Sequence, residues 1–154
     1  EDIPELLGGA EKPVQGVFIN APGKVSFYTV CLMGDNSAQS LINSLTGQSF
    51  PLNDEMGRSV LMEVGNIVTA AYLNALSHMT NLLFLPEPPQ LVADMAGAIL
   101  GTILAEANVA EDFILVLKTA FVTDSKNIDG SFLIIPDVEA LDTVVDLLLN
   151  GAEK

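Results

Sequence analysis

The 154-residue sequence is poor in cations, histidine and cysteine, and it contains no tryptophan. Six lysines and arginines stand against 20 acidic residues, so the formal net charge is −14. A nucleic-acid-binding surface needs clustered cations that displace counterions from phosphates, and this scarcity excludes one. Anionic membrane surfaces are disfavoured for the same reason. No apolar run approaches the ~20 residues needed to span a bilayer. We therefore expect no membrane insertion.

The single cysteine and the single histidine limit the available chemistry. Cys31 lies in the apolar run "FYTVCLM", which predicts a buried, inert thiol. A lone cysteine makes no intrachain disulfide, which fits a reducing compartment, so we expect a cytoplasmic protein. A metal site or a Ser-His-Asp triad would depend on His78 alone. We expect His78 to be a partly exposed residue at a helix end.

Nucleotide and metal motifs are also absent. The stretches "GDNSAQS" and "LLGGAEKP" lack the glycine–lysine–hydroxyl spacing of a P-loop. Asp94, Asp112, Asp124 and Asp129 are too dispersed to form a calcium loop. The acidic N-terminal stretch "EDIPELLGGAEKP" has no basic region, so we do not expect a signal peptide. We expect the chain to carry no metal or cofactor of its own.

What is present is a large apolar fraction of 49% in a chain of single-domain length. We expect one globular domain over residues 1–154, with residues 1–12 as an irregular lead-in. The patterns predict an α+β fold in which an antiparallel sheet packs against long helices. Strands are expected at 13–20, 25–33, 81–85, 111–123 and 131–136, and helices at 34–47, 54–79, 86–108 and 137–151.

Local signals define several of these elements. Pro22-Gly23 suits a tight turn between the first two strands, which predicts a hairpin. Asp35, Asn36 or Ser37 is a candidate N-cap for the following helix, and Gly47 a candidate terminator. The segment 124–130 is predicted to be a polar turn. The helix at 86–108 is so apolar that we expect it to be buried on most sides.

The order of elements repeats without a matching sequence. Strand–turn–strand–helix occupies residues 13–47 and again 111–151. A long helix and a short strand precede the second copy, but nothing equivalent precedes the first. The pattern therefore indicates a pseudo-two-fold fold that is one-sided, or a chain whose beginning is missing.

The helix predicted at 54–79 has an unusual outer face. On a helical wheel, Glu63 and Asn66 fall within ~60° of Ser59. Ala70, Asn74 and Ser77 join them. The predicted inner face holds Leu61, Val64, Val68, Ala71, Tyr72, Ala75 and Met79. Such a distribution indicates an amphipathic helix with a small, uncharged-to-acidic outer stripe.

Glu63 and Asn66 are neighbours at i and i+3 on that stripe. A carboxylate can pair with a cation of a partner or act as a base. An amide can hold a water molecule as both donor and acceptor. Together they suit the orientation of water toward an electrophile on a second molecule. The alternative is an ordinary solvated helix face, which spacing alone favours.

The segment "SVLMEVGN" followed by "PEPP" fits the pattern Ser/Asp–x3–Glu–x2–Asn–x21–Pro, with Ser59, Glu63, Asn66 and Pro88 at its four positions. This resembles the CheC/CheX/FliY family of chemotaxis response-regulator phosphatases. The flanks "EVGNI" and "PPQLVADM" resemble the family too, and "PPQLVADM" looks more like the second half of CheC than like CheX. "GVFINAPGKVSFYTV" and "LINSLTG" resemble the hairpin and helix between the two motif helices of CheC. CheC carries two motifs and this chain shows one, so the resemblance implies a CheC-like, pseudo-two-fold architecture with the first motif helix absent.

The resemblance also implies a mechanism. Asn66 would orient the water that attacks the aspartyl phosphate of a CheY-type response regulator, and Glu63 would pair with that partner's active-site lysine. Ser59 and Pro88 would shape the helix start and the neighbouring loop. The partner, in this mechanism, brings Mg2+ and the electrophile, so the chain needs no cofactor.

Other partners follow from the same resemblance. The alternative to a phosphatase is a non-catalytic module that binds a CheD-type deamidase or a flagellar-switch component. A homodimer or strand exchange could also cover the sheet edge that a missing first motif leaves.

Overall fold

A computed structural model describes residues 8–23, 26–106, 115–122, 127–136, 142–143, 146 and 149. Its centre is a five-stranded sheet in the order β3-β1-β2-β5-β4, with every neighbouring pair antiparallel. The strands are β1 (Pro13–Ala21), β2 (Phe27–Gly34), β3 (Gln90–Met95), β4 (Leu115–Val122) and β5 (Asn127–Pro136). The predicted α+β class with an antiparallel sheet is confirmed.

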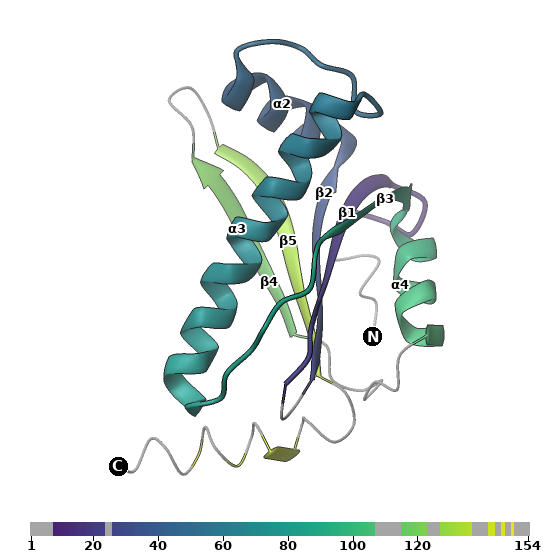
Figure 1. The fold of residues 1–154 in the computed structure, drawn as a ribbon. Coiled ribbons are helices and arrows are strands. Elements are labelled where there is room, and N and C mark those ends of the chain that lie inside the picture. The colour runs from purple at the N-terminus through teal and green to yellow at the C-terminus, as the bar shows by residue number, and fades with distance from the viewer. Residues whose placement is uncertain are drawn as a thin grey trace.

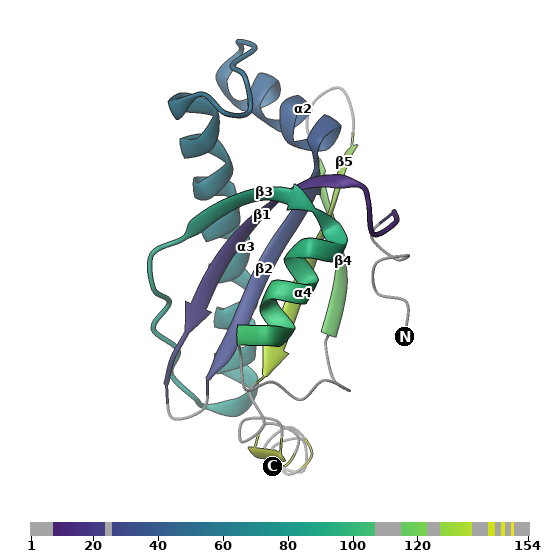
Figure 2. The same ribbon diagram turned by 90° about the vertical axis from the view of Figure 1, so that its right-hand side faces the viewer.

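Helices cover both faces of this sheet. One face carries α2 (Asp35–Thr46) and the long α3 (Glu55–Thr80), which crosses the strands diagonally (Figure 1). The other face carries α4 (Ala96–Glu106), which lies over β1 and β2 (Figure 2). The molecule is therefore a three-layer arrangement in its described part.

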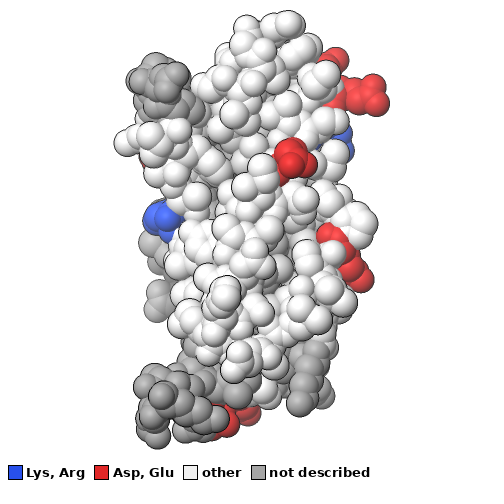
Figure 3. Space-filling model, turned by 60° about the vertical axis from the view of Figure 1, so that its left-hand side comes forward, with Lys and Arg blue, Asp and Glu red and all other residues white. Residues whose placement is uncertain are grey.

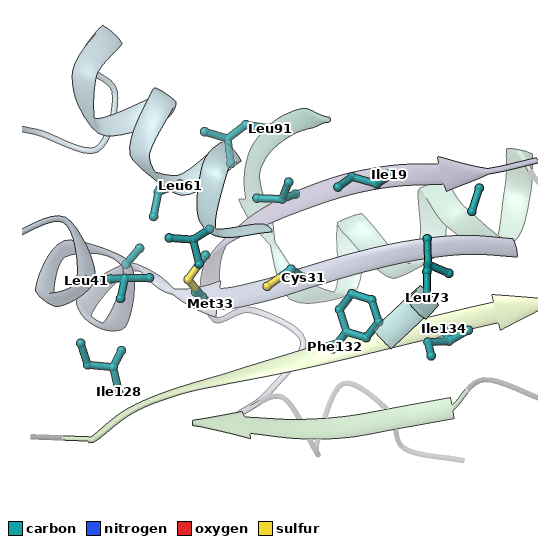
Figure 4. Packing of buried hydrophobic residues seen from close by; sticks show 14 of the residues in the cluster. Ile19, Cys31, Met33, Leu41, Leu61, Leu73, Leu91, Ile128, Phe132 and Ile134 are labelled. Carbon is teal, nitrogen blue, oxygen red and sulfur yellow. The ribbon is translucent and has the colours of Figure 1, made fainter. Parts of the chain in front are cut away.

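Alternation along the strands builds two cores. In β1 and β2, Ile19, Cys31 and Met33 point toward α2 and α3 (Figure 4), and Val17 packs against Gly65 of α3. Their neighbours face the opposite way and pack with α4, as Val30 and Leu32 do. This is the period-2 pattern of a strand with both faces covered. Cys31 is fully buried, as predicted.

The pseudo-two-fold arrangement is visible in the sheet. The hairpins β1–β2 and β4–β5 meet where β2 pairs antiparallel with β5, so the two copies face each other at the sheet centre. β3 adds a strand beyond β1 at one edge. No described strand lies beyond β4 at the other edge. The asymmetry expected from the element order is therefore present in the described sheet.

The buried row of α3 winds around the helix. Gly57, Leu61, Gly65, Thr69 and Leu73 are buried at intervals of four residues. An i±4 row is inclined by about 26° to the helix axis. The face that meets the sheet therefore drifts around the helix. Leu61 and Val64 of the predicted inner face are buried. Ala71, Ala75 and Met79, predicted to face inward, are exposed.

The expectation about apolar runs also needs correction. By length and composition, α3 is one helix apolar enough to cross a bilayer, with 28% of its most apolar 18-residue window buried. Its buried row nonetheless packs on the sheet, as Gly65 against Val17 shows. Glu63 near its middle would make a bilayer position costly. We therefore treat α3 as a covering helix of the sheet.

The region between α3 and α4 differs most from expectation. The predicted helix at 86–108 begins only at Ala96, because residues 90–95 form β3 and pair with β1. The predicted strand at 81–85 is reduced to one bridge between Phe84 and Gly23. On α4, Gly101, Thr102 and Ala105 are exposed, so this helix is not buried on most sides.

Smaller differences concern the ends of elements. Gly34 is the N-cap of α2 and no side chain caps it, so the three predicted caps were wrong, whereas Gly47 ends the helix at φ 75° as expected. β5 begins at Asn127, inside the predicted polar turn. Of the predicted closing helix, positions 142, 143, 146 and 149 are helical, and its other residues lie outside the described part.

Candidate active site on helix α3

Helix α3 is defined at both ends by its own residues. The Asp54 side chain accepts a hydrogen bond of 3.1 Å from the Met56 backbone N–H, which caps the first turn. Asn81 ends the helix in the left-handed conformation at φ 61°. Ser59 lies a turn inside the helix, so it does not form the helix start as we expected.

The three motif residues of α3 share one exposed face. Ser59, Glu63 and Asn66 occupy positions i, i+4 and i+7, and all three are exposed. Glu63 and Asn66 have no hydrogen-bond or ion-pair partner among the described residues. The prediction that Asn66 faces outward is confirmed. Both side chains are therefore available to a second molecule.

A glycine between these two residues holds the helix against the sheet. Gly65 is buried, and a Cβ at this position would lie 2.5 Å from Val17 Cγ1. Real Cβ atoms do not approach so closely, so a glycine permits this packing distance. The backbone of α3 thus packs closely onto β1 within the turn that carries the exposed Glu63 and Asn66. The site is built on a rigid element, as orientation of a reactant requires.

Pro88 lies in the connection that returns from α3 to β3. The connection runs back beside α3 (Figure 1). The Glu87 N–H donates to the Asn20 carbonyl at 2.9 Å, and Arg58 Nη2 donates to the Leu91 carbonyl at 3.5 Å. These bonds tie the segment around Pro88 to β1 and to the first turns of α3. Pro88 is exposed and is brought toward the Ser59 end of the motif.

The surroundings of the pair are largely uncharged. Ile67, directly after Asn66, is 60% exposed, and Ala70 and Ala71 are also exposed. Few charged side chains interrupt the surface over α3 (Figure 3). Glu63 therefore stands out as an isolated carboxylate on an apolar to neutral face.

The described residues contain no other obvious catalytic set. No group of three or more His, Cys, Asp or Glu side chains in this part could hold a metal ion. His78 is exposed in the last turn of α3, as expected. Burial raises the pKa of the Cys31 thiol to about 12, so it stays protonated and unreactive near neutral pH.

Comparisons with known proteins find a similar family and a similar protein. A CheC-like family model matches residues 56–93, the segment that contains Ser59, Glu63, Asn66 and Pro88. The CheY-P phosphatase CheC of Bacillus subtilis (strain 168) is 27% identical over 149 residues, which cover 92% of this chain and 71% of that protein. The resemblance to the CheC/CheX/FliY family is thereby confirmed.

Solved structures of two proteins of the CheC/CheX/FliY family share the fold. A chain in the CheX–CheY–BeF3–Mg2+ complex from Borrelia burgdorferi has a TM-score of 0.53 and 16% identity, over 88% of this chain and 90% of that chain. Thermotoga maritima FliY has a TM-score of 0.65 and 10% identity, over 98% and 78%. At these identities the likeness concerns the fold alone.

Sequence reasoning missed the part played by Gly65. An isolated glycine inside a helical pattern costs about 1 kcal/mol relative to alanine, so it signals close packing. Gly57 carries the same signal eight residues earlier, where a Cβ would meet the Pro51 carbonyl oxygen. Two such glycines on the buried row of α3 indicated that this helix packs closely against its neighbours.

Proposed function

We propose that this CheC-like chain is a phosphatase that hydrolyses the aspartyl phosphate of a CheY-type response regulator. The observation that carries the proposal is the exposure of Glu63 and Asn66, side by side on α3, without partners in the described part of the chain. The relatives supply the choice of substrate, since one is a CheY-P phosphatase and another was solved with CheY.

The reaction places modest demands on this chain. Attack of a water oxygen on phosphorus forms a new P–O bond and breaks the bond to the aspartate oxygen, which releases inorganic phosphate and free aspartate. An acyl phosphate has a good leaving group, so placing the water in line with phosphorus supplies most of the catalysis. The Asn66 amide oxygen accepts a hydrogen bond from that water and its NH2 group donates to a phosphoryl oxygen.

Glu63 has a different task in this scheme. Its carboxylate pairs with a lysine of the regulator and fixes the position of α3 in the partner's cleft. The isolated Glu63 carboxylate fixes how the regulator docks. A docked orientation without a cation opposite Glu63 would leave the carboxylate desolvated and unpaired. Mg2+ belongs to the regulator, and the fold keeps Asn66 exposed so that it can reach the regulator's site.

The test is the decay of a phosphorylated CheY-type regulator in the presence of Mg2+. We expect wild-type protein to accelerate decay and Asn66→Ala to abolish the acceleration. Asn74→Ala is the matched control, because Asn74 is an exposed asparagine two turns further along α3. Full activity of Asn66→Ala would reject the role of Asn66. Equal loss in both variants would indicate damage to α3 rather than loss of a water-orienting group.

Binding of a CheD-type deamidase or flagellar-switch component, homodimer formation and a cytoplasmic location remain predictions. A non-catalytic module would bind such a partner while leaving the decay of the phosphorylated regulator unchanged. The decay assay therefore separates the two proposals.

A further inference from the structure

A cavity of about 520 Å³ lies away from the motif helix. Its wall includes Val14 and Leu32 from the core cluster under α4 and Met33 from the cluster under α2 and α3, so it lies at the end of the sheet near the start of α2. β4 and β5 contribute Lys118, Thr119, Asp129, Gly130 and Ser131, and the start of α2 contributes Gly34 and Ser37. Gly8 and Lys12 complete it from the lead-in.

The charge of this cavity departs from that of the chain. Three described residues are cationic, and two of them, Lys12 and Lys118, line this one cavity. The whole chain carries a net charge of −14, so the two cations contrast with its overall charge. Among the described residues of the lining, Asp129 is acidic. Lys12 and Lys118 bring positive charge to the cavity, and Lys118 is also engaged in other interactions.

Lys12 is held in place by backbone contacts. Its carbonyl accepts a hydrogen bond from the Ala96 N–H at 2.9 Å, and its own N–H donates to the Gly9 carbonyl at 3.2 Å. Its side chain passes between two glycines, since a Cβ on Gly8 or Gly34 would lie 3.1 or 3.2 Å from Nζ. Lys12 has no ion-pair partner among the described residues.

The exposed Lys12 ammonium lies beside the N-terminus of α2. Gly34 is the N-cap of α2 and offers no side-chain acceptor. A helix N-terminus carries partial positive charge, so Lys12 Nζ adds a second positive charge beside it. Asp35 in the first turn offsets part of this charge, although its carboxylate also accepts a 3.1 Å hydrogen bond from Gln15. An anion in the cavity would be attracted by both positive groups.

The donors of the cavity suit a phosphate group better than a carboxylate. Two ammonium groups and the hydroxyls of Ser37 and Ser131 line it, whereas the Thr119 hydroxyl already donates to the Leu117 carbonyl at 3.4 Å. Lys118 Nζ donates to Ser131 Oγ at 3.5 Å, and this hydroxyl keeps its own proton for donation. Three phosphoryl oxygens can accept from this many donors, whereas a carboxylate offers two. We propose that the cavity binds a phosphate group, as inorganic phosphate or as a small phosphate ester.

Calorimetric titration at constant ionic strength tests the proposal, with sodium phosphate and glycerol 3-phosphate as separate probes and sodium acetate as the comparison. We expect saturable binding of at least one phosphate probe and none of acetate. Tighter binding of phosphate itself indicates the free ion, and tighter binding of the ester indicates an esterified ligand. Absence of saturable binding for both probes overturns the proposal.

Variants locate the binding in the cavity. We expect Lys12→Gln and Lys118→Gln each to weaken binding by about tenfold, the loss typical of one charge-assisted contact. Asp129→Asn removes the opposing carboxylate and should strengthen binding by about threefold. Arg58→Gln is the control, because it removes the described cation that lies outside the cavity. If Arg58→Gln and Lys12→Gln weaken phosphate binding equally, the effect comes from the overall charge of the protein, and the site is rejected.

A second measurement keeps the test valid if a lysine variant unfolds. In wild-type protein, the amide resonances of Gly34, Ser37 and Gly130 should shift with saturating phosphate, and unchanged resonances reject the site. Asn66→Ala should retain phosphate binding, because Asn66 is not part of the cavity lining. A negative result in the phosphatase assay would therefore not reject phosphate binding in the cavity. A negative result in the phosphate titration would likewise not reject the phosphatase function.

Discussion

Gly65 of α3 and Val17 of β1 pack so closely that a Cβ on the glycine would lie 2.5 Å from Cγ1 and 2.6 Å from Cβ of the valine. Val17 lies on β1 and is completely buried, so it has little room to move. The contact fixes the distance between α3 and the sheet. It also fixes the position of the helix backbone that carries the exposed Glu63 and Asn66.

Gly65→Ala should destabilise the protein. Alanine gains about 1 kcal/mol in helix propensity, but overpacking of a filled core costs about 1–3 kcal/mol. At a 2.5 Å contact with a buried side chain, we expect the packing cost to exceed the gain. Chemical denaturation should show a lower midpoint.

A second glycine provides the matched control for this substitution. Gly101 lies within α4, where a Cβ would meet nothing within 4 Å. Gly101→Ala should therefore raise the free energy of unfolding by about 0.5–1 kcal/mol. Equal effects of the two substitutions would contradict the close approach of α3 to β1.

Thr69 follows Gly65 in the same buried row of α3, and its side chain carries a polar atom that the described core does not pair. It is 1% exposed, and its hydroxyl has no hydrogen-bond partner among the described residues. An unpaired buried hydroxyl costs about 1–3 kcal/mol. Thr69→Val keeps the shape and removes the polar atom, so we expect stability to rise by about 1 kcal/mol. Denaturant titration checks this, and a loss of stability would mean that the hydroxyl is paired.

Local patterns were sufficient for much of the fold. Period-2 alternation and the Pro22-Gly23 turn located the first hairpin, and Gly47 located the end of α2. The outer stripe of α3 identified Glu63 and Asn66, because a polar pair on an apolar helix depends only on spacing. The exposure of Asn66 could be predicted because it depends on the pattern of residues within two turns of the same helix.

The remaining elements depend on contacts that are distant in sequence. Gln90–Met95 was assigned to a helix because prolines precede it, yet pairing with β1 makes it an edge strand. Leu91 is the residue that this strand buries, so no clear alternation marks it. The winding of the buried row of α3 likewise follows from how the helix crosses the sheet. Ala71, Ala75 and Met79 could not be placed without that crossing.

Cys31 provides a test of core integrity. Its thiol is fully buried, and burial raises its pKa from 9.0 to about 12. At pH 8 the native thiol should therefore react with a disulfide reagent far more slowly than the same thiol in denaturant. Fast labelling of native protein at this pH would contradict the burial of β2.

The same shift predicts a pH dependence of stability. A thiol whose folded pKa is raised favours folding in its protonated form, so its contribution is constant below about pH 8. Stability should then fall as pH rises from about 9 toward 12, because only the unfolded chain readily loses the proton. A Cys31→Ala variant should lack this part of the alkaline loss when the two unfolding curves are compared.

Glu63 and Asn66 should affect different steps of the proposed phosphatase reaction. Asn66→Ala removes the group that orients water after docking, so kcat should fall by about 10²-fold or more while KM changes little. Glu63→Gln keeps the shape but removes the pair with the regulator's lysine, so KM should rise by about tenfold with a smaller change in kcat. Steady-state rates over a range of phosphorylated regulator concentrations separate the two effects.

Salt provides an independent check on this assignment. Wild-type KM should rise with ionic strength, because a docking pair at a solvent-accessible interface is screened. Glu63→Gln should lose most of that salt dependence, whereas Asn66→Ala should retain it in a direct binding measurement. If Glu63→Gln instead lowered kcat alone and left the salt dependence intact, Glu63 would be acting on the reacting groups and not on docking. Asn66 would then share the chemical step with a carboxylate that can accept the water proton.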